Sequence, residues 1–341
     1  MKIVFVHFTA RIPQYLMDNI NRVCDIFPEQ EVVLITDLEV TNFRLPDNFK
    51  LHKILLEDEY WQVKDTLTHP KNFRDNFWFN SIARLIALCN YSTLTGQQIL
   101  HFESDVLVSN DIPIGEFLAL DRPLGYTILG ENRGIASVLW ISDPDFAQIL
   151  KEFVIASVIK NPQTTDMLIL SEFKLAFPNL VRIFASFPVY DDSFKLLPEL
   201  IKEDFVYTQY NFDGCFDAAD VGQYLFGDDP RNHRGRKYVR KELLTSYFKP
   251  RCTNYFYSHE RNFINFDLKP PLKIYSLHIH SKDRKIFKSQ NISKILQKGI
   301  QSQSKPEKKI LVFEVFFLSL YKSILRKSTL CLERVKRIQT E

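Results

Sequence analysis

The sequence has little glycine, and it lacks the glycine-rich loops that most often cradle phosphate groups. Only 10 of its 341 residues are glycine. Neither the GxGxxG pattern of dinucleotide-binding folds nor the GxxxxGK pattern of P-loops occurs in it. Both of these phosphate cradles are therefore excluded. Phenylalanine and tyrosine are abundant instead, with 29 and 14 residues, which favours a well-filled core and aromatic stacking surfaces.

The five cysteines are scattered and never form a CxxC pair. Their odd number and irregular spacing argue against a disulfide framework and against a structural zinc site. No segment is long and apolar enough to indicate a membrane span. The first residues are apolar for too short a stretch to resemble a signal peptide, and they predict a buried strand instead. We therefore expect a protein of the reducing cytoplasm.

The chain has no global excess of one charge, since its formal net charge is only +3. A basic field for nucleic acid is not indicated, so no nucleic-acid partner is expected. The charge is nevertheless uneven, because residues 305–341 hold nine Lys and Arg against four Glu. This basic, amphipathic tail, within residues 301–341, predicts either a helix on the anionic inner face of a membrane or a helix packed on the body.

Apolar runs with strand character alternate with segments of helical periodicity, which predicts an α/β fold with an open, mostly parallel sheet. We expect one catalytic domain over residues 1–290, with a donor-binding part over about 1–140 and an acceptor-binding part over about 141–290. The expected strands are 2–8, 31–37, 50–56, 98–102, 124–129, 136–141, 181–187 and 273–280. The expected helices are 15–26, 75–90, 144–159 and 165–177.

An acidic pair follows one of the expected core strands. Glu103 and Asp105 come directly after the apolar run that ends at Phe102. Ligands of such sheets bind outside the carboxyl ends of the strands, and a spacing of two points both carboxylates to the same side. Two carboxylates held in this way suit a divalent cation such as Mn²⁺ or Mg²⁺. The alternative is a polar strand end without a ligand.

This pair resembles the DxD-type motif of GT-A fold glycosyltransferases, with Glu in place of the first Asp. The helix before it, around residues 77–85, is similar to the helix that precedes the motif in such families. The resemblance implies that Arg84 contacts the donor sugar or its phosphates. A solvated helix arginine is the alternative.

Residues 274–282 resemble the C-terminal histidine element of the same enzymes. That element implies a histidine in the metal shell and a lysine on the donor diphosphate. By the period of a strand, His278, His280 and Lys282 share one face. We assign His280 to the metal, although the choice between it and His278 stays open, and we assign His278 and Lys282 to the donor. Two solvated histidines at a strand end are the alternative.

Two further acids are candidates for catalysis. The resemblance implies an acidic residue at the start of a helix that contacts the transferred sugar or the acceptor, and Asp166 fits this position. A helix-capping segment is the equally weighted alternative. Asp213 begins a segment rich in Asp and Gly, over residues 212–232, that resembles a block of bacterial glycosyltransferase-like proteins. Such a segment suits either a sugar site or a loop of Asx turns.

The donor base is expected near the end of the first strand. His7, Phe8 and Thr9 lie there, where a uracil ring can stack. Asp37, at the end of the second strand, is placed to contact the base or the ribose. These assignments rest on position alone, and a buried aromatic or a turn residue is the alternative for each.

Together these features predict a metal-dependent enzyme that moves a hexose from a nucleotide-diphosphate sugar, most simply a UDP-sugar, to a saccharide or glycolipid acceptor. An inverting enzyme also needs a general base, for which Asp166 and Asp213 are the candidates. Two rivals remain. One is a sugar nucleotidyltransferase, although the glycine-rich basic loop expected after its first strand is missing. The other is a non-catalytic binding protein on a degenerate transferase fold.

Overall fold

The fold is that of a computed structural model. It describes residues 1–8, 11–40, 45–54, 58–71, 73–229, 247–248, 255–258, 263–266, 273–282 and 284–288. Contacts divide the chain into one unit over Met1–Gly299 and a second over Ile300–Glu341. The basic tail of residues 301–341, and with it the predicted membrane helix, lies outside the described residues.

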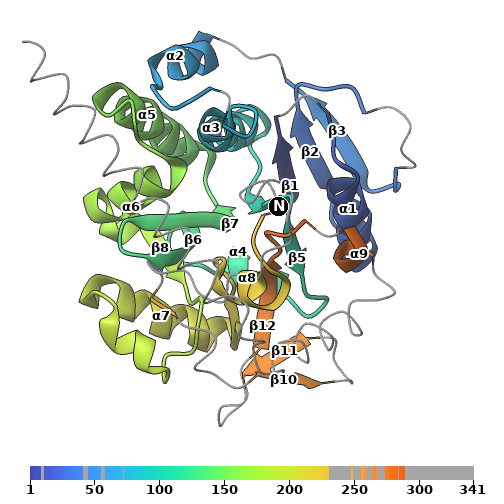
Figure 1. The fold of residues 1–341 in the computed structure, drawn as a ribbon, viewed down its shortest axis with the longest axis vertical. Helices are drawn as coiled ribbons and strands as arrows, with labels where there is room; N and C mark the ends of the chain where they lie inside the picture. Colours follow the sequence, from blue (N-terminus) through green and yellow to red (C-terminus); the bar gives the residue numbers. More distant parts are fainter. Residues whose placement is uncertain are drawn as a thin grey trace, which may run out of the picture. The chain divides into compact units, whose positions relative to one another are not determined.

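A seven-stranded sheet forms the centre of the first unit (Figure 1). All of its neighbouring strands run parallel except β7, which is antiparallel to both β4 and β6. The predicted α/β class with a mostly parallel sheet is therefore confirmed. In sheet order, the strands are β3 (Phe49–Lys53), β2 (Val32–Thr36), β1 (Lys2–His7), β4 (Ile99–Phe102), β7 (Arg133–Ile141), β6 (Leu124–Gly130) and β8 (Val181–Phe184).

Helices cover the sheet and connect its strands, as the alternating sequence pattern predicts. The bounds of α3 extend the expected helix at its C-terminal end, where Gly96 adopts a left-handed φ of 65° and stops it. The helices are α1 (Gln14–Ile26), α2 (Asp58–Thr66), α3 (Phe77–Thr95), α4 (Ile114–Leu118), α5 (Pro144–Lys160), α6 (Asp166–Ala176), α7 (Glu199–Phe212), α8 (Asp220–Phe226) and α9 (Arg284–Phe287), with short 3₁₀ turns at Pro178–Leu180 and Asp192–Leu196.

Side-chain caps fix where two of these helices begin. The carboxylate of Asp143 accepts the backbone N–H of Asp145 at 2.8 Å, at the start of α5. The hydroxyl of Thr165 accepts the N–H of Leu168 at 3.2 Å, at the start of α6. Both caps satisfy amides that a first turn otherwise leaves unpaired. The second one sets the direction of the first turn of α6, which carries Asp166.

A second sheet lies beside the first, and the sequence pattern did not predict it as a sheet. Its path is β10 (Tyr255–Ser258), β11 (Phe263–Phe266), β12 (Lys273–His278) and β5 (Val106–Val108), with β9 (Gly214–Phe216) parallel to β12. Strand β5 pairs antiparallel with β12, so that Val106 faces His278. Because β4 belongs to the first sheet and β5 to the second, residues 103–105 connect the two sheets.

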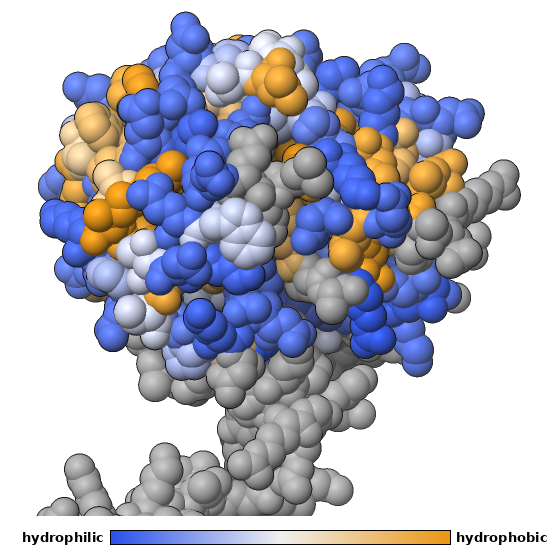
Figure 2. Space-filling model, turned by 90° about the horizontal axis from the view of Figure 1, so that it is seen from above, coloured by the Kyte–Doolittle hydropathy of each residue, from blue (hydrophilic) through white to orange (hydrophobic). Residues whose placement is uncertain are grey.

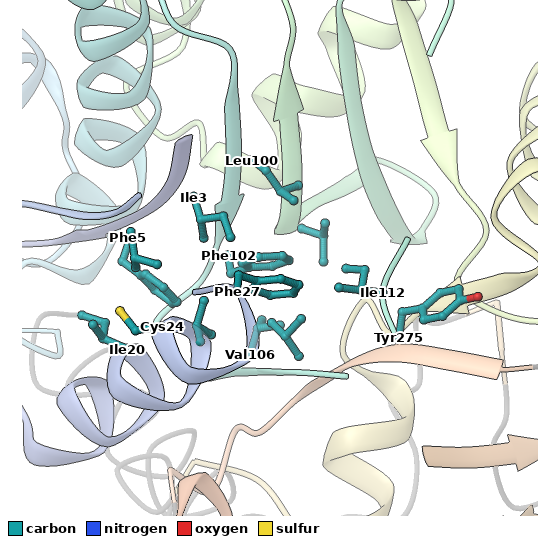
Figure 3. Close-up of a cluster of buried hydrophobic side chains, with 14 of the residues drawn as sticks. Ile3, Phe5, Ile20, Cys24, Phe27, Leu100, Phe102, Val106, Ile112 and Tyr275 are labelled. Carbon is teal, nitrogen blue, oxygen red and sulfur yellow. The ribbon is translucent and has the colours of Figure 1, made fainter. Parts of the chain in front are cut away.

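A hydrophobic cluster packs α1 against both sheets. Figure 3 shows side chains from α1, from β1 and β4 of the first sheet, and from β5 and β12 of the second gathered in one layer. Burial of such side chains stabilises the fold by about 25 cal/mol per Å² of apolar surface. The cluster therefore fixes the position of the segment between β4 and β5. Labelled members include Ile3, Phe5, Ile20, Cys24, Leu100, Phe102, Val106 and Tyr275.

The outer surface is mainly polar where it is described. In Figure 2 hydrophilic residues cover most of the visible face, and hydrophobic residues form separate groups between them. In the described part of the chain, no helix has the length and the apolar character that a membrane crossing requires. The three described cysteines, Cys24, Cys89 and Cys215, are buried and free.

Candidate active site

The acidic pair lies directly after β4, as expected, but on a tight turn, so the period of a strand does not set the direction of its side chains. The backbone N–H of Val106 bonds the carbonyl of Glu103 at 3.0 Å, which closes the turn. The amide of the fully buried Asn19, on α1, donates to the carbonyls of Ser104 and Val106 at 3.2 and 2.8 Å. The carbonyl of Asp105 accepts the N–H of Ile279 at 2.7 Å. The two carboxylates thus converge because neighbouring elements hold the turn.

His278, the last residue of β12, points its imidazole at these carboxylates. Its Nε2 lies 3.1 Å from Glu103 Oε2 and 3.4 Å from Asp105 Oδ1. One ligand atom from each of the three residues falls within 4.8 Å of the others. His280 stacks its ring on that of His278, with centroids 4.2 Å apart. The structure therefore favours His278 over His280 as the histidine ligand of the metal.

The chemistry of this three-residue group fits a divalent cation. The Nδ1 of His278 lies 2.8 Å from the carbonyl of Ala218, and because a carbonyl only accepts, Nδ1 carries the proton. This leaves Nε2 as the nitrogen that faces Glu103 and Asp105. A histidine ligand oriented by a backbone carbonyl in this way is common in metal sites. Two carboxylates and one imidazole suit Mn²⁺ well and Mg²⁺ less well.

Asp217, in the Asp- and Gly-rich segment, anchors the backbone of His278. The carboxylate of Asp217, which is 1% exposed, accepts the backbone N–H groups of His278, Val221 and Gly222 at 3.0, 3.0 and 2.8 Å. Burial raises the pKa of Asp217, and these three hydrogen bonds oppose the increase. For Asp217, the structure gives an anchoring role instead of a contact with sugar.

Gly222 is tightly packed against the same histidine, which predicts a sensitive position. A Cβ atom there would lie 2.1 Å from the carbonyl oxygen of His278. We expect Gly222→Ala to lower the free energy of unfolding by about 1–3 kcal/mol, because backbone must move to relieve the clash, and to weaken Mn²⁺ binding. Denaturant unfolding and Mn²⁺ titration measure the two effects. Gly115→Ala, on α4, is the control, because a Cβ atom at that position would have no neighbouring atom within 4 Å. Equal effects at both positions would contradict the proposed packing role.

Arg84, on α3, holds two carboxylates of the site. Its guanidinium contacts Glu103 and lies 2.9 Å from Asp166 Oδ2. Burial lowers the pKa of Arg84, but the charges of Glu103 and Asp166 outweigh it and the pKa is raised. Burial also raises the pKa of Asp166, and Arg84 opposes this. The arginine therefore fixes the orientation of Glu103 and Asp166.

A second chain of ion pairs begins at Asp105. The ammonium of Lys282 lies 2.6 Å from Asp105 Oδ2 and 3.3 Å from Asp229 Oδ2. The same oxygen of Asp229 lies 3.3 Å from Arg74 Nη2. Burial favours a lower pKa for Lys282, but Asp105 and Asp229 raise it. Sequence reasoning missed Arg74 and Asp229, because the pairing depends on segments far apart in the chain.

Opposite charges alternate throughout this network. The pKa of Asp105 is held well below its usual range, because the charges of Lys282 and His278 outweigh its burial. The pKa of His278 is raised to about 9, because Asp105 and Glu103 outweigh its burial. The pKa of His280 is lowered by burial and by the charge of His278. The carboxylate of Asp105 is therefore ionised at neutral pH, as a ligand of a cation must be, whereas His278 has to release a proton before it can bind one.

Apart from Asp229, these groups line one cavity of about 390 Å³. His7 and Phe8 lie on its wall, and their contact with a base stays a prediction. Thr9 lies outside the described residues. The polar and charged residues on the wall include Arg74, Asn80, Arg84, Glu103, Asp105, Arg133, Asp166, Gln223, His278, His280 and Lys282.

Two sequence candidates are not on this wall. Asp213 ends α7 with a left-handed φ of 50°, and its side chain is 82% exposed and 3.6 Å from Lys273. The structure thus assigns it a helix-ending role and does not bring it to the cavity. Asp37 follows β2, and its Oδ1 is buried without a hydrogen-bond partner among the described residues. It is absent from the residues that line the cavity.

Comparisons with known proteins find only distant likeness. No family model matches the chain, and no curated protein matches it. Solved structures of glycosyltransferases are similar to part of it. The galactosyltransferase LgtC, in complex with donor and acceptor sugar analogues, is 18% identical, with a TM-score of 0.39 over 55% of this chain and 74% of that one.

Two other solved structures are similar at the same level. A glycosyltransferase involved in the glycosylation of the major capsid of PBCV-1 is 14% identical, with a TM-score of 0.32 over 60% of this chain and 90% of that one. The PaToxG glycosyltransferase is 9% identical, with a TM-score of 0.33 over 62% and 77%. Because these TM-scores are low, the function has to be argued from the site itself.

Proposed function

We propose that this chain is a metal-dependent glycosyltransferase that moves a hexose from a nucleotide-diphosphate sugar, a UDP-sugar in the simplest case, to a saccharide or glycolipid acceptor. The observation that carries the proposal is the group of Glu103, Asp105 and His278, which share one cavity with Lys282 and Arg84. Acidic ligands and fixed cations on one wall are what a diphosphate leaving group requires. The resemblance of the acidic pair to the DxD-type motif points to the same chemistry.

Each charged residue then has a defined task. Glu103, Asp105 and His278 would hold the cation, and a bound cation would supply positive charge against the departing diphosphate. Lys282 adds a second positive charge beside Asp105 and binds the diphosphate oxygens. Arg84 keeps Glu103 and Asp166 in place, and its position on the wall lets it meet the donor. His280, on the same wall, supports the ring of His278 by stacking.

Asp166 is the candidate for contact with the reacting sugar. It is 6% exposed, it lies on the cavity wall, and its carboxylate is fixed by Arg84 at 2.9 Å. A carboxylate in this position binds hydroxyls of the transferred sugar or takes the proton of the acceptor hydroxyl. His7 and Phe8 lie at the end of β1 and provide the surface for the base. In this arrangement, residues 1–140 form the donor-binding part and residues 141–290 the acceptor-binding part, apart from His278 and Lys282, which complete the donor site.

A thermal-shift screen tests the proposal. UDP-glucose, UDP-galactose and UDP are each added to the full chain with Mn²⁺ and, separately, with a chelator. A ligand at a hundred times its Kd stabilises the folded state by about 2.7 kcal/mol. For a protein of this size that corresponds to a rise in Tm of about 3–5 °C. We expect the rise with Mn²⁺ and its loss with the chelator.

Two further measurements distinguish the rival functions. A sugar nucleotidyltransferase releases pyrophosphate from a nucleoside triphosphate and a sugar phosphate, so an assay of pyrophosphate identifies it. A binding protein shows the shift without hydrolysis or transfer of the sugar. The absence of any shift across UDP-, GDP- and CDP-sugars would sink the proposed function.

A further inference from the structure

The cavity contains one buried amide that no part of the proposed chemistry uses. Gln223, on α8, is 3% exposed and lines the cavity. Its Nε2 has no hydrogen-bond partner among the described residues. A buried amide without a partner lowers the stability of the fold. A buried amide at a cavity wall that has no partner in the protein is suited to hydrogen-bond a bound ligand.

The position of Gln223 shows which part of a ligand it meets. The residue before it, Gly222, packs against the carbonyl of His278. The residue one turn earlier, Ala219, also lines the cavity. Gln223 is therefore tied to the segment that carries His278 of the metal group. With a diphosphate at that group, the moiety bonded to the diphosphate is the next one within reach.

The wall around Gln223 has the character of a sugar site. Leu129, Ile135 and Ala219 form a small buried cluster, and Met167 packs against it. All four of these residues line the cavity. Sugar-binding sites combine an apolar surface for the face of the ring with a few polar groups for its hydroxyls. Gln223 supplies such a polar group within the apolar wall.

We propose that Gln223 is a specificity-determining residue that donates a hydrogen bond from Nε2 to a hydroxyl oxygen of the transferred hexose. This inference rests on the proposed function and deepens it. A site built to bond one hydroxyl discriminates against sugars that lack it or carry it in the other orientation. The residue then distinguishes between hexoses, and it contributes little to binding of the nucleotide diphosphate itself.

The test compares affinities for a nucleotide with and without its sugar. Calorimetric titrations in Mn²⁺ measure the Kd of UDP, UDP-glucose and UDP-galactose for the wild type and for Gln223→Met. We expect the Kd of UDP to change less than about twofold. The Kd of the preferred UDP-hexose should rise about tenfold, as expected for the loss of one hydrogen bond of about 1.4 kcal/mol. The preference between the two hexoses should fall at the same time.

A stability measurement separates this role from a structural one. Methionine keeps the length of the side chain and removes the amide, so the ligand-free Tm of Gln223→Met should be equal to or above that of the wild type. Gln148→Met is the matched control, because the Nε2 of Gln148 bonds Glu152 on the exposed face of α5 at 2.8 Å. We expect no change in any Kd for that variant.

The possible outcomes are distinct. A loss of affinity that is confined to the UDP-hexose supports the assignment. A lowered Tm, an equal loss for UDP and UDP-hexose, or no loss at all overturns the role of Gln223 and leaves the proposed function in place. Failure of the wild type to bind any of the three nucleotides contradicts the proposed function, and the inference falls with it.

Discussion

Asp105→Asn is expected to lower sugar-nucleotide turnover at least a hundredfold. Asparagine keeps the shape of the side chain but removes the charge that a hard cation requires. Even the loss of an outer-shell partner lowers metal affinity by about 10–100-fold, and Asp105 belongs to the group of ligands itself. The measurement is the Mn²⁺-dependent release of UDP from UDP-hexoses, at saturating metal and over a range of metal concentrations.

Asp105→Asn should leave the protein folded, so that a loss of turnover reports on the metal group and not on unfolding. Lys282 loses one carboxylate in Asp105→Asn but keeps Asp229 at 3.3 Å. The Tm in chelator should therefore change little, while the rise in Tm caused by Mn²⁺ should disappear. Asp213→Asn is the matched control, because that side chain is 82% exposed. Full turnover in Asp105→Asn would remove the metal group from the proposal, and a loss in Asp213→Asn would return that residue to the site.

The acidic pair and the histidine segment could be found from the sequence for a simple reason. Both follow short apolar runs that form core strands, β4 and β12, and polar residues directly after such strands stand out. Period-2 reasoning placed His278, His280 and Lys282 together, and all three line the cavity. The open sheet was predictable in the same way, because its strands and helices alternate along the chain.

The choice between the two histidines could not be made from the sequence. It depends on the pairing of β12 with β5, which sets His278 opposite Val106, and on the carbonyl of Ala218, which is 60 residues away. The turn at residues 103–105 depends in a similar way on Asn19, from a helix 85 residues earlier. Local patterns carry no information about such contacts. They identify residue types at strand ends, and tertiary packing then decides which atoms meet.

The same reasoning explains why the role of the Asp- and Gly-rich segment was open. Carboxylates near glycines suit sugar binding and Asx turns equally well in sequence. In the structure, the two Asp residues differ in how far they are buried and in what they bond. Asp217 is enclosed and bonds three backbone amides, whereas Asp213 is exposed. Gln223, later in the same segment, is buried like Asp217, but its Nε2 has no hydrogen-bond partner among the described residues.

The largest effect on stability is expected away from the site, at Asp204 on α7. Its side chain is 1% exposed, and its two oxygens lie 2.5 Å from Lys174 Nζ, 2.8 Å from Arg182 Nη1 and 3.1 Å from Arg122 Nη1. Lys174 lies on α6, Arg182 on β8 and Arg122 in the loop before β6, so one carboxylate joins three segments of the chain. Asp204→Asn removes the carboxylate charge that pairs with all three of these cations, although Arg182 keeps Asp121 at 2.6 Å, and it leaves Lys174 and Arg122 facing Arg182 with less negative charge between them.

Breaking a buried ion pair by removing one partner costs about 3–5 kcal/mol, because an uncompensated charge remains. We expect Asp204→Asn to lower the Tm by about 4–7 °C, measured by calorimetry at one scan rate. Asp192→Asn is the control, because the pair of Asp192 with Lys195 is exposed at 94% and 79%, and its loss should leave the Tm unchanged. Equal Tm values for the two variants would show that the cations around Asp204 are compensated by other groups. A selective loss instead identifies Asp204 as the residue that fastens α7 to the sheet edge at β8.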